Sequence, residues 1–369
     1  MSKEQALLQS YKIGELTLKN RVAMAPMTRS RANNPENTPN RALQGEYYRQ
    51  RASAGLIITE GSQISSRAVG YINTPGIYSE AQVEGWKEVT QAVHDDGGII
   101  FIQLWHVGRI SHPDFHNGKL PLAPSAINPN AKSFTPEGLK DTVTPKAMSK
   151  EEIKETVQDF KNAAKNAMEA GFDGIEIHSS NGYLLHQFFS STSNTRTDEY
   201  GGSKENRARI LFEIIDAIKE VMPENRIGLR LNPSLHGIFG MEMNEETIPT
   251  FDYIVNELND YDLAYLHLSE PFNDVSALPF AETQIAKRYR PMYKGTLIIN
   301  SNFDQEKGNA VIEAGDADLV AFGKPYVSNP DLVERFEQNA PLNEWDADTF
   351  YTPGVKGYLD YPVLEEVVK

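Results

Sequence analysis

Eight short apolar runs, separated by helix-like segments, constrain the fold of this chain more than any other feature. Apolar runs that alternate with amphipathic helical patterns indicate βαβ units and therefore a parallel sheet. Eight such units are the number that closes a (β/α)8 TIM barrel. In chain order the runs lie at residues 21–27, 55–61, 99–106, 174–178, 227–233, 264–270, 296–302 and 319–324. We therefore predict an α/β fold of this barrel type.

The segments between the runs contain amphipathic helices. Ser149 and Glu152 form a capping box ahead of an apolar stripe with helical spacing, and the stripe ends at Gly171. A second apolar stripe runs from Ile210 to Ile218, with charged residues on its opposite face. We expect both helices to turn their apolar stripes toward the core.

Two segments depart from this alternation. Residues 107–147 are rich in Pro, Asn and Ser and lack a comparable helical pattern, so we predict a long excursion over the barrel mouth after the third strand. Residues 11–20 have the pattern of an N-terminal hairpin that plugs the bottom of the barrel. No linker or internal repeat divides the chain, so we expect one domain over residues 1–369.

Composition limits the chemistry that such a barrel carries. The 369 residues include no cysteine, which excludes a disulfide framework, a thiolate nucleophile and a thiolate metal site. The formal net charge of −15 disfavours nucleic acids and anionic membranes as partners. No apolar run approaches the roughly 20 residues that span a bilayer, and the start lacks a signal-peptide pattern. We therefore expect a cytoplasmic protein.

Polar residues collect at the carboxyl ends of the predicted strands, where barrel enzymes place their active sites. Neutral or cationic donors outnumber paired carboxylates there, which disfavours glycoside hydrolysis and favours a planar, anionic ligand rich in acceptors. These strand-end residues are Pro26, Thr28, Glu60, Gly61, Gln103, Trp105, His106, His178, Arg230, Asn232, His267, Ser269, Asn302, Gly323 and Lys324.

Six ordered blocks, which include "NRVAMAPMTRSRA", "IQLWHVGRISH" and "AFGKPYVSNPDL", resemble the Old Yellow Enzyme family of FMN-dependent ene-reductases. Within the family the chain is similar to the branch of pentaerythritol tetranitrate, N-ethylmaleimide and 12-oxophytodienoate reductases. The resemblance implies non-covalent FMN, NAD(P)H as electron donor, and an electrophilic alkene or nitro compound as substrate. It also implies a monomer or a homodimer.

The resemblance assigns a flavin site. Reduced FMN carries negative charge around N1 and the C2 carbonyl, which the permanently charged guanidinium of Arg230 would stabilise. The Gln103 amide would meet the donor and acceptor positions of the pyrimidine edge, and the Thr28 hydroxyl would reach the C4 oxygen. The predicted phosphate site consists of Asn302, Gly323 and Lys324. The other predicted cofactor residues are Ala25, Pro26, Met27 and Gly61.

Two departures from the family pattern fall in the phosphate region. Relatives generally have arginine at position 324 and a small Gly/Ala-rich turn in place of Asn300 and Ser301. Lysine binds phosphate as a point charge, without the bidentate fork of arginine. We therefore expect this chain to retain FMN but to lose it more easily.

The turn after the fourth run carries the predicted catalytic residues. Hydride adds to the β-carbon of an enone only if electron density moves onto the oxygen, and His178 and Asn181 can point two donors at that oxygen. Tyr183 then protonates the α-carbon, because a phenol with a pKa of about 10 keeps its proton at neutral pH. NAD(P)H and substrate would use this pocket in turn, which predicts ping-pong kinetics. The resemblance implies that the substrate pocket is lined by Tyr71, Trp105 and Tyr351.

Three other functions remain open on the sequence. A metal-dependent hydrolase would use His106, His178 and His267, but it needs acidic partners at neighbouring strand ends, so we assign no metal site. A Schiff-base aldolase would use Lys324, for which a phosphate site is the simpler role. A flavin carrier or sensor would bind FMN without oxidising NAD(P)H.

Overall fold

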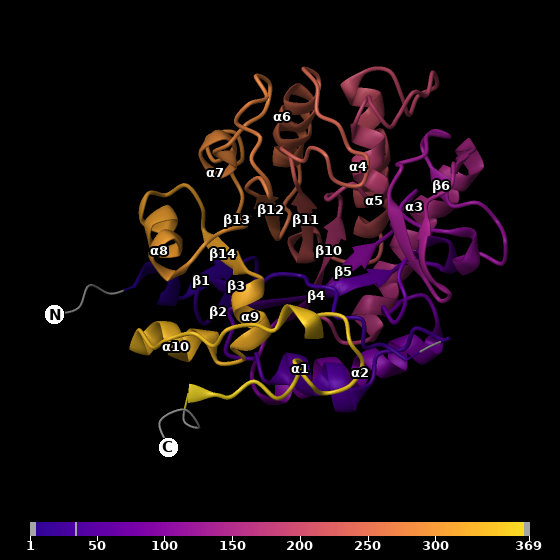
Figure 1. The fold of residues 1–369 in the computed structure, drawn as a ribbon. Coiled ribbons are helices and arrows are strands. Elements are labelled where there is room, and N and C mark those ends of the chain that lie inside the picture. Colours follow the sequence, from indigo (N-terminus) through magenta and orange to yellow (C-terminus); the bar gives the residue numbers. More distant parts are fainter. Residues whose placement is uncertain (1–4, 34, 365–369) are drawn as a thin grey trace.

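The computed structural model describes residues 5–33 and 35–364. At its centre eight parallel strands form a closed barrel (Figure 1), which confirms the predicted fold. Each strand coincides with one predicted apolar run, and the pairing of the third strand with the fourth closes the ring. The barrel strands are β3 (Val22–Met24), β4 (Leu56–Gln63), β5 (Ile100–Trp105), β10 (Gly174–His178), β11 (Ile227–Leu231), β12 (Tyr265–Ser269), β13 (Leu297–Asn300) and β14 (Leu319–Phe322).

Helices surround this barrel. The capping box predicted at Ser149 opens α3, where Ser149 and Glu152 each accept a hydrogen bond from the other's backbone N–H. The stripe from Ile210 to Ile218 is the buried face of α5. The helices are α1 (Glu46–Arg49), α2 (Glu80–Asp95), α3 (Lys150–Glu169), α4 (Leu184–Phe189), α5 (Lys204–Lys219), α6 (Thr247–Glu257), α7 (Ile285–Tyr289), α8 (Gln305–Glu313), α9 (Lys324–Ser328) and α10 (Leu332–Gln338).

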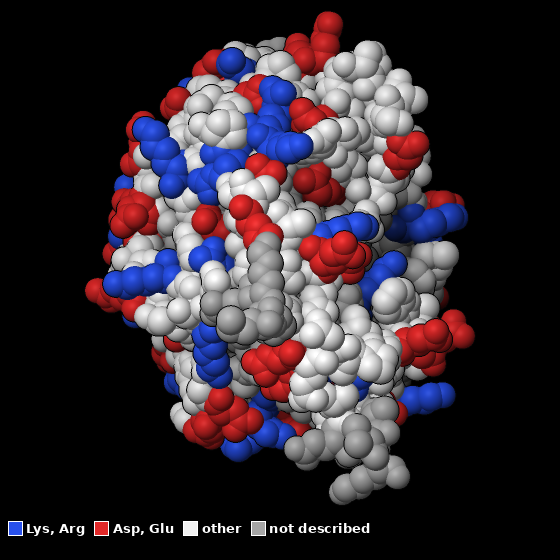
Figure 2. Space-filling view, turned by 90° about the vertical axis from the view of Figure 1, so that its left-hand side faces the viewer, with Lys and Arg blue, Asp and Glu red and all other residues white. Residues whose placement is uncertain are grey.

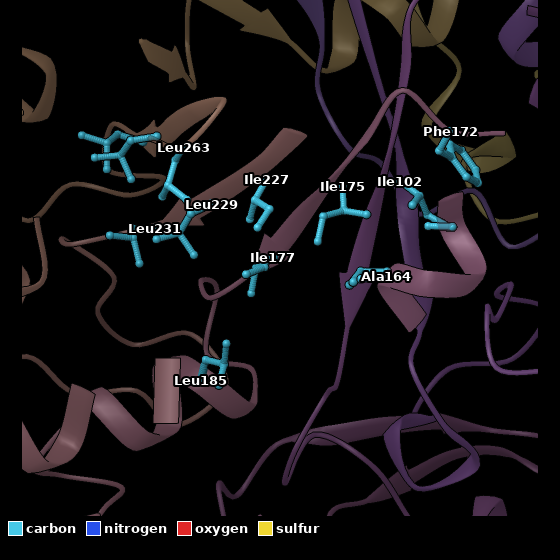
Figure 3. Close-up of a cluster of buried hydrophobic side chains, with 14 of the residues drawn as sticks. Ile102, Ala164, Phe172, Ile175, Ile177, Leu185, Ile227, Leu229, Leu231 and Leu263 are labelled. Carbon is cyan, nitrogen blue, oxygen red and sulfur yellow. The ribbon is translucent and has the colours of Figure 1, made fainter. Parts of the chain in front are cut away.

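The main core lies between the barrel and its helices. Because side chains alternate along a strand, every second residue of a barrel strand faces outward. Figure 3 shows Ile175 and Ile177 of β10 in this cluster, together with Ile102 of β5 and Ala164 of α3. These apolar contacts hold the helices against the sheet.

The bottom of the barrel is closed by a hairpin of β1 (Tyr11–Ile13) and β2 (Leu16–Leu18). Its Ile13 and Leu18 belong to a second buried cluster, which contains inward-facing residues such as Phe101 and Ile298. This contact confirms the predicted plug.

Polar side chains occupy the inward positions at the carboxyl ends of the strands. Strand register places His178 beside Arg230 and Arg230 beside His267. Farther around the ring, Ser269 lies beside Asn300. The alternation that turns isoleucine and leucine toward the helices therefore brings these polar groups together inside the barrel.

The segment between β5 and α3 forms the predicted excursion. It contains β6 (Leu122–Ala123), β7 (Lys132–Thr135), β8 (Gly138–Asp141) and β9 (Lys146–Ala147). β7 and β8 pair as an antiparallel hairpin, and their Phe134 and Leu139 line the same cavity as Trp105 and Tyr183. The excursion therefore lies over the barrel mouth.

Acidic and basic side chains are interspersed over the face shown in Figure 2. Within residues 5–33 and 35–364, no helix has the length and apolar character needed to cross a bilayer. The cytoplasmic location stays a prediction. So does the single domain over 1–369, of which residues 1–4, 34 and 365–369 lie outside the described residues.

Candidate active site at the barrel mouth

The turn after β10 reverses the chain within a few residues. Asn181 and Gly182 have φ angles of +57° and +81°, a left-handed conformation that glycine and asparagine adopt most readily. The buried amide of Gln187 in α4 then fixes the turn by donating to the carbonyl oxygens of Val107 and Gly182, at 3.1 and 2.8 Å. His178, Asn181 and Tyr183 leave the barrel wall from this one turn.

His178 is a buried, neutral hydrogen-bond donor. Burial lowers the pKa of His178 well below its ordinary value, and the neighbouring charge of Arg230 lowers it further. The Ser180 backbone N–H donates to His178 Nδ1 at 3.3 Å, so the neutral ring carries its proton on Nε2. The ring therefore keeps one N–H donor for a ligand.

Asn232 orients the side chain of Asn181. The Nδ2 atom of Asn232, a fully buried residue just after β11, donates to Asn181 Oδ1 at 3.2 Å. With its oxygen occupied, the Asn181 amide has its NH₂ group left to donate. A clamp on a ligand oxygen needs two donors of this kind. The clamp itself stays a prediction.

Tyr183 lies among aromatic rings. Its ring meets Trp105 and His178 edge-on, with ring centroids 5.0 and 5.1 Å apart, and its hydroxyl is 3.0 Å from that of Tyr71. Burial, followed by the neighbouring Tyr71, raises the pKa of Tyr183 well above its ordinary value. The phenol therefore keeps its proton across the physiological pH range.

A cavity of about 590 Å³ opens next to Tyr183. The structure brings all three predicted pocket residues to its wall, together with Thr28. Tyr351, which is 66% exposed, reaches it from the C-terminal segment, whereas Trp105 and Tyr71 come from the barrel side. The sequence analysis did not identify the further apolar lining residues, because they lie on the β7–β8 hairpin or on loops, without a motif. They are Ile72, Phe134, Leu139 and Phe239.

A network of buried polar side chains lies below the mouth. Glu176 accepts hydrogen bonds from Gln103 Nε2 at 2.7 Å and from His267 Nδ1 at 2.8 Å. Burial by itself would raise the pKa of Glu176, but His267, Arg230 and Gln103 together lower it. Because burial also lowers the pKa of His267, the pair is a carboxylate bonded to a neutral imidazole.

The sequence analysis gave Glu176 no functional role. Its signal was nevertheless present, since it is a charged residue at an inward position between two isoleucines that face the helices. A carboxylate at such a position is rare unless it has a partner. That partner comes from another strand and is therefore visible only in the fold.

Arg230 is buried beside this network. Its Nη2 donates to Asn300 Oδ1 at 3.1 Å and to Ser269 Oγ at 3.4 Å. Its Nε is buried and has no hydrogen-bond partner among the described residues. A buried donor without an acceptor costs stability, so we expect a ligand to supply an acceptor for this nitrogen. The acceptors at N1 and C2 of a flavin fit this requirement.

A second cavity, of about 620 Å³, lies at the ends of β13 and β14. Asn302, Gly323 and Lys324 all line it, as expected for a phosphate site, and Lys307 adds a second lysine. The Nζ atom of Lys324 lies 5.6 Å from the centre of the Trp345 ring. A cavity with two lysines fits the phosphate end of FMN.

The remaining predicted cofactor residues lie on the first two barrel strands and the turn that follows β3. The Ala25 N–H donates to the Phe322 carbonyl at 3.0 Å, and Pro26 and Met27 follow it. A Cβ atom on Gly61 would come within 2.6 Å of the Trp105 ring, so glycine makes room for the indole. The contacts of Ala25, Pro26, Met27 and Gly61 with a flavin stay predictions.

No group of three or more histidine, aspartate and glutamate side chains is arranged to hold a metal ion in the described part of the chain. Of the histidines considered for a metal-dependent hydrolase, His267 is bonded to Glu176, and His106 Nδ1 accepts from the Gly108 N–H at 3.0 Å.

Comparisons with known proteins identify the family of this chain. A model of the NADH:flavin oxidoreductase / NADH oxidase family matches residues 6–343. Among curated proteins, 12-oxophytodienoate reductase 1 of Oryza sativa subsp. japonica is 43% identical, over 98% of this chain and 94% of that protein. 12-Oxophytodienoate reductase 2 of Arabidopsis thaliana is 41% identical, over 97% of this chain and 96% of that protein.

Solved structures give the same result. Morphinone reductase superposes with a TM-score of 0.91 at 44% identity, over 100% of this chain and 98% of that chain. An Old Yellow Enzyme homologue from Zymomonas mobilis also has a TM-score of 0.91, at 39% identity, over 97% of this chain and all of that chain. One morphinone reductase structure contains tetrahydroNAD.

These matches confirm the resemblance to Old Yellow Enzyme and, with it, FMN as the cofactor and a reduced nicotinamide as the electron donor. The residues matched by the family model include all eight barrel strands. The chain belongs to the NADH:flavin oxidoreductase / NADH oxidase family and is an FMN-dependent oxidoreductase.

Proposed function

We propose that this chain reduces the activated C=C bond of α,β-unsaturated carbonyl or nitro compounds, with NAD(P)H as donor and a ping-pong mechanism. When bound, FMN would supply the hydride chemistry, first accepting a hydride from the nicotinamide and then giving one to the β-carbon of the substrate. One observation carries the proposal: the Ser180 N–H leaves His178 with a free Nε2–H donor beside the protonated phenol of Tyr183.

His178 and Asn181 hold the carbonyl or nitro oxygen of the substrate. The oxygen gains negative charge as hydride reaches the β-carbon, and two fixed donors stabilise that charge without reorganising. Because burial lowers the pKa of His178, the ring stays a neutral donor and forms no ion pair with the product. Loss of one such donor typically costs ~2.7–4 kcal/mol of transition-state stabilisation.

Tyr183 gives a proton to the α-carbon. Its raised pKa keeps the proton available, and its hydrogen bond with Tyr71 fixes the direction of the phenol. Gln103, Arg230 and Thr28 would hold the flavin ring, and the phosphate would bind at the cavity lined by Asn302, Gly323 and Lys324. The aromatic lining of the cavity beside Tyr183 favours hydrophobic substrates.

The relatives support this substrate class. Their names identify 12-oxophytodienoate and morphinone as the compounds on which those reductases act. We propose that this chain acts on the same chemical class, a conjugated ketone with an apolar body. 2-Cyclohexenone is the smallest probe that contains the required C=C and C=O groups.

Tyr183→Phe tests the proposal in its two half-reactions. Anaerobic NAD(P)H should bleach the yellow flavin equally in the variant and the unsubstituted protein, because no proton from Tyr183 is needed there. Reoxidation by 2-cyclohexenone should slow by about 10²–10⁴-fold, the usual contribution of a general acid. Stopped-flow absorbance of the flavin measures both rates.

Tyr200→Phe is the matched control, since the Tyr200 hydroxyl donates to Glu213, away from both cavities. Its two half-reactions should remain unchanged. Equal loss of both half-reactions in Tyr183→Phe would remove Tyr183 from the acid role. A bound flavin that neither NADH nor NADPH bleaches would instead support a carrier or sensor.

A further inference from the structure

Asn300, the last residue of β13, holds the guanidinium of Arg230. Its Oδ1 accepts from Arg230 Nη2 at 3.1 Å, and its Nδ2 donates to the Ala321 carbonyl of β14 at 2.8 Å. The side chain is 7% exposed. With both ends of its amide bonded, Asn300 cannot rotate, so Arg230 is attached to a rigid acceptor on the barrel wall.

Ser269 of β12 completes this attachment. Its hydroxyl oxygen accepts from the same Nη2 of Arg230 at 3.4 Å and lies 3.5 Å from Asn300 Oδ1. Because β11, β12 and β13 are neighbours in the barrel, the contact reaches across two strands. One nitrogen of the guanidinium is thus bonded to protein, while its Nε remains without a partner in the described part of the chain.

A second group inside the barrel attracts Arg230. Glu176 on the neighbouring strand β10 is fully buried, and its negative charge opposes the effect of burial on the pKa of Arg230. Attraction between opposite charges is strong in an interior that excludes water. A guanidinium released from Asn300 would therefore turn toward Glu176, and its charge would be neutralised there.

We propose that Asn300 is a positioning residue that keeps Arg230 turned toward the flavin and away from Glu176, and that it thereby strengthens the binding of reduced FMN over oxidised FMN. The inference rests on the proposed placement of the flavin beside Arg230. Negative charge collects around N1 and the C2 carbonyl only in the reduced form. A fixed guanidinium at that edge therefore favours the reduced form selectively.

Two variants of the FMN-loaded protein test this inference, Asn300→Ala and Asn300→Asp. Alanine removes the acceptor, so the affinity for reduced FMN should fall about tenfold more than the affinity for oxidised FMN. For a two-electron couple, this difference makes the midpoint potential about 30 mV more negative. Aspartate keeps the shape of the side chain and places a negative charge directly on Arg230. Its shift should therefore be larger and of the same sign.

Anaerobic titration against a reference dye gives the midpoint potential, and titration of apoprotein with FMN gives the affinity of the oxidised form. Asn20→Ala is the matched control, because Asn20 is a buried amide that accepts from Val22 and Gly55 N–H near the start of β3 and β4. It should reduce thermal stability and leave the potential unchanged.

Equal weakening of both flavin forms in Asn300→Ala, with an unchanged potential in Asn300→Asp, would show a purely structural role and overturn the inference. The variant Arg230→Lys distinguishes failure of the proposed role of Asn300 from failure of the proposed function. A lower potential in Arg230→Lys, but not in the Asn300 variants, would overturn the role of Asn300 alone. An unchanged potential in Arg230→Lys would overturn the flavin placement as well.

Discussion

At the scale of single residues, the site depends on partners that decide which atom of a side chain faces the ligand. The Ser180 backbone N–H selects the His178 tautomer, and Asn232 selects the orientation of the Asn181 amide. Neither partner needs to touch the substrate. Both fix a donor in advance, which reduces the reorganisation that catalysis would otherwise require.

Asn232→Ala should loosen the clamp. Without its hydrogen bond the Asn181 amide is free to rotate, so a phenol bound against His178 and Asn181 should lose roughly 0.5–1.5 kcal/mol, the net contribution of one hydrogen bond. Titration of the charge-transfer band between phenol and flavin measures this loss. An unchanged dissociation constant for the phenol would show that Asn181 is held by other groups.

Sequence reasoning found the residues whose role follows from a local motif. His178, Asn181 and Tyr183 lie within five positions of one another, and the structure places them on one turn. It identified Asn300 only as a departure from the family pattern. The bond from Asn300 to Arg230 spans 70 residues of sequence and depends on strand order, so no local pattern contains it.

At the scale of elements, the barrel strands were predictable because burial on both faces makes each a short apolar run. The hairpin β7–β8 was not, because its Phe134 and Leu139 are more than half exposed and lack an apolar alternation. For the C-terminal segment the resemblance placed Tyr351 in the substrate pocket, but no local pattern predicted the path of the chain. The segment carries Tyr351 to the cavity without regular strand structure, and side chains from the turn after β3 hold it.

Arg31 is the main anchor of that segment. Its guanidinium donates to the carbonyl oxygens of Thr349 and Phe350 at 2.9 Å each, and to those of Gly354 and Lys356 at 3.2 Å. Hydrogen bonds from a charged group contribute about 1.5–3 kcal/mol each. The position of Tyr351 at the cavity rim therefore depends on a residue that does not line the cavity.

Arg31→Ala should release residues 349–357. Their backbone amides should exchange with deuterium faster, and KM for a bulky enone should rise more than kcat falls, because the rim positions substrate without taking part in the chemistry. Mass spectrometry of peptic peptides measures the exchange. Arg51→Ala is the control, since Arg51 bonds to Tyr326 and Val327 instead. Equal exchange of residues 349–357 in Arg31→Ala and the unsubstituted protein would contradict the prediction.

At the scale of the whole molecule, the barrel buries several titratable groups in their neutral forms. Burial lowers the pKa of His106 and of His186 to about 3 and that of His116 to about 4, all from 6.5. Burial acts in the opposite direction on Glu60 and raises the pKa of its carboxyl from 4.5 to about 7. Each of these groups makes the free energy of unfolding depend on pH. Because there are three histidines and one carboxyl, the effect of the histidines is the larger.

The sign follows from proton counts. Below pH 6.5 the three histidines take up protons in the unfolded chain but not in the folded one, so each lowers the free energy of unfolding as the pH falls. Between pH 7 and 4.5 Glu60 holds its proton more tightly in the folded chain and opposes this loss. Counting these four groups alone, the unfolded chain binds two more protons than the folded chain between pH 6.5 and 4.5. Their contribution to the free energy of unfolding should therefore fall by about 2.7 kcal/mol for each pH unit.

Urea unfolding of the FMN-loaded protein at pH 5 and pH 6, followed by tryptophan fluorescence, measures this slope. His106→Asn keeps an acceptor for the Gly108 N–H and removes one titrating ring, so the slope should fall by about 1.4 kcal/mol per pH unit. Glu60→Gln keeps an acceptor for the Arg29 N–H and removes the opposing proton, so the slope should become steeper by about 1.4 kcal/mol per pH unit. Because the two variants must change the slope in opposite directions, an equal slope in both would show that these buried groups do not control acid unfolding.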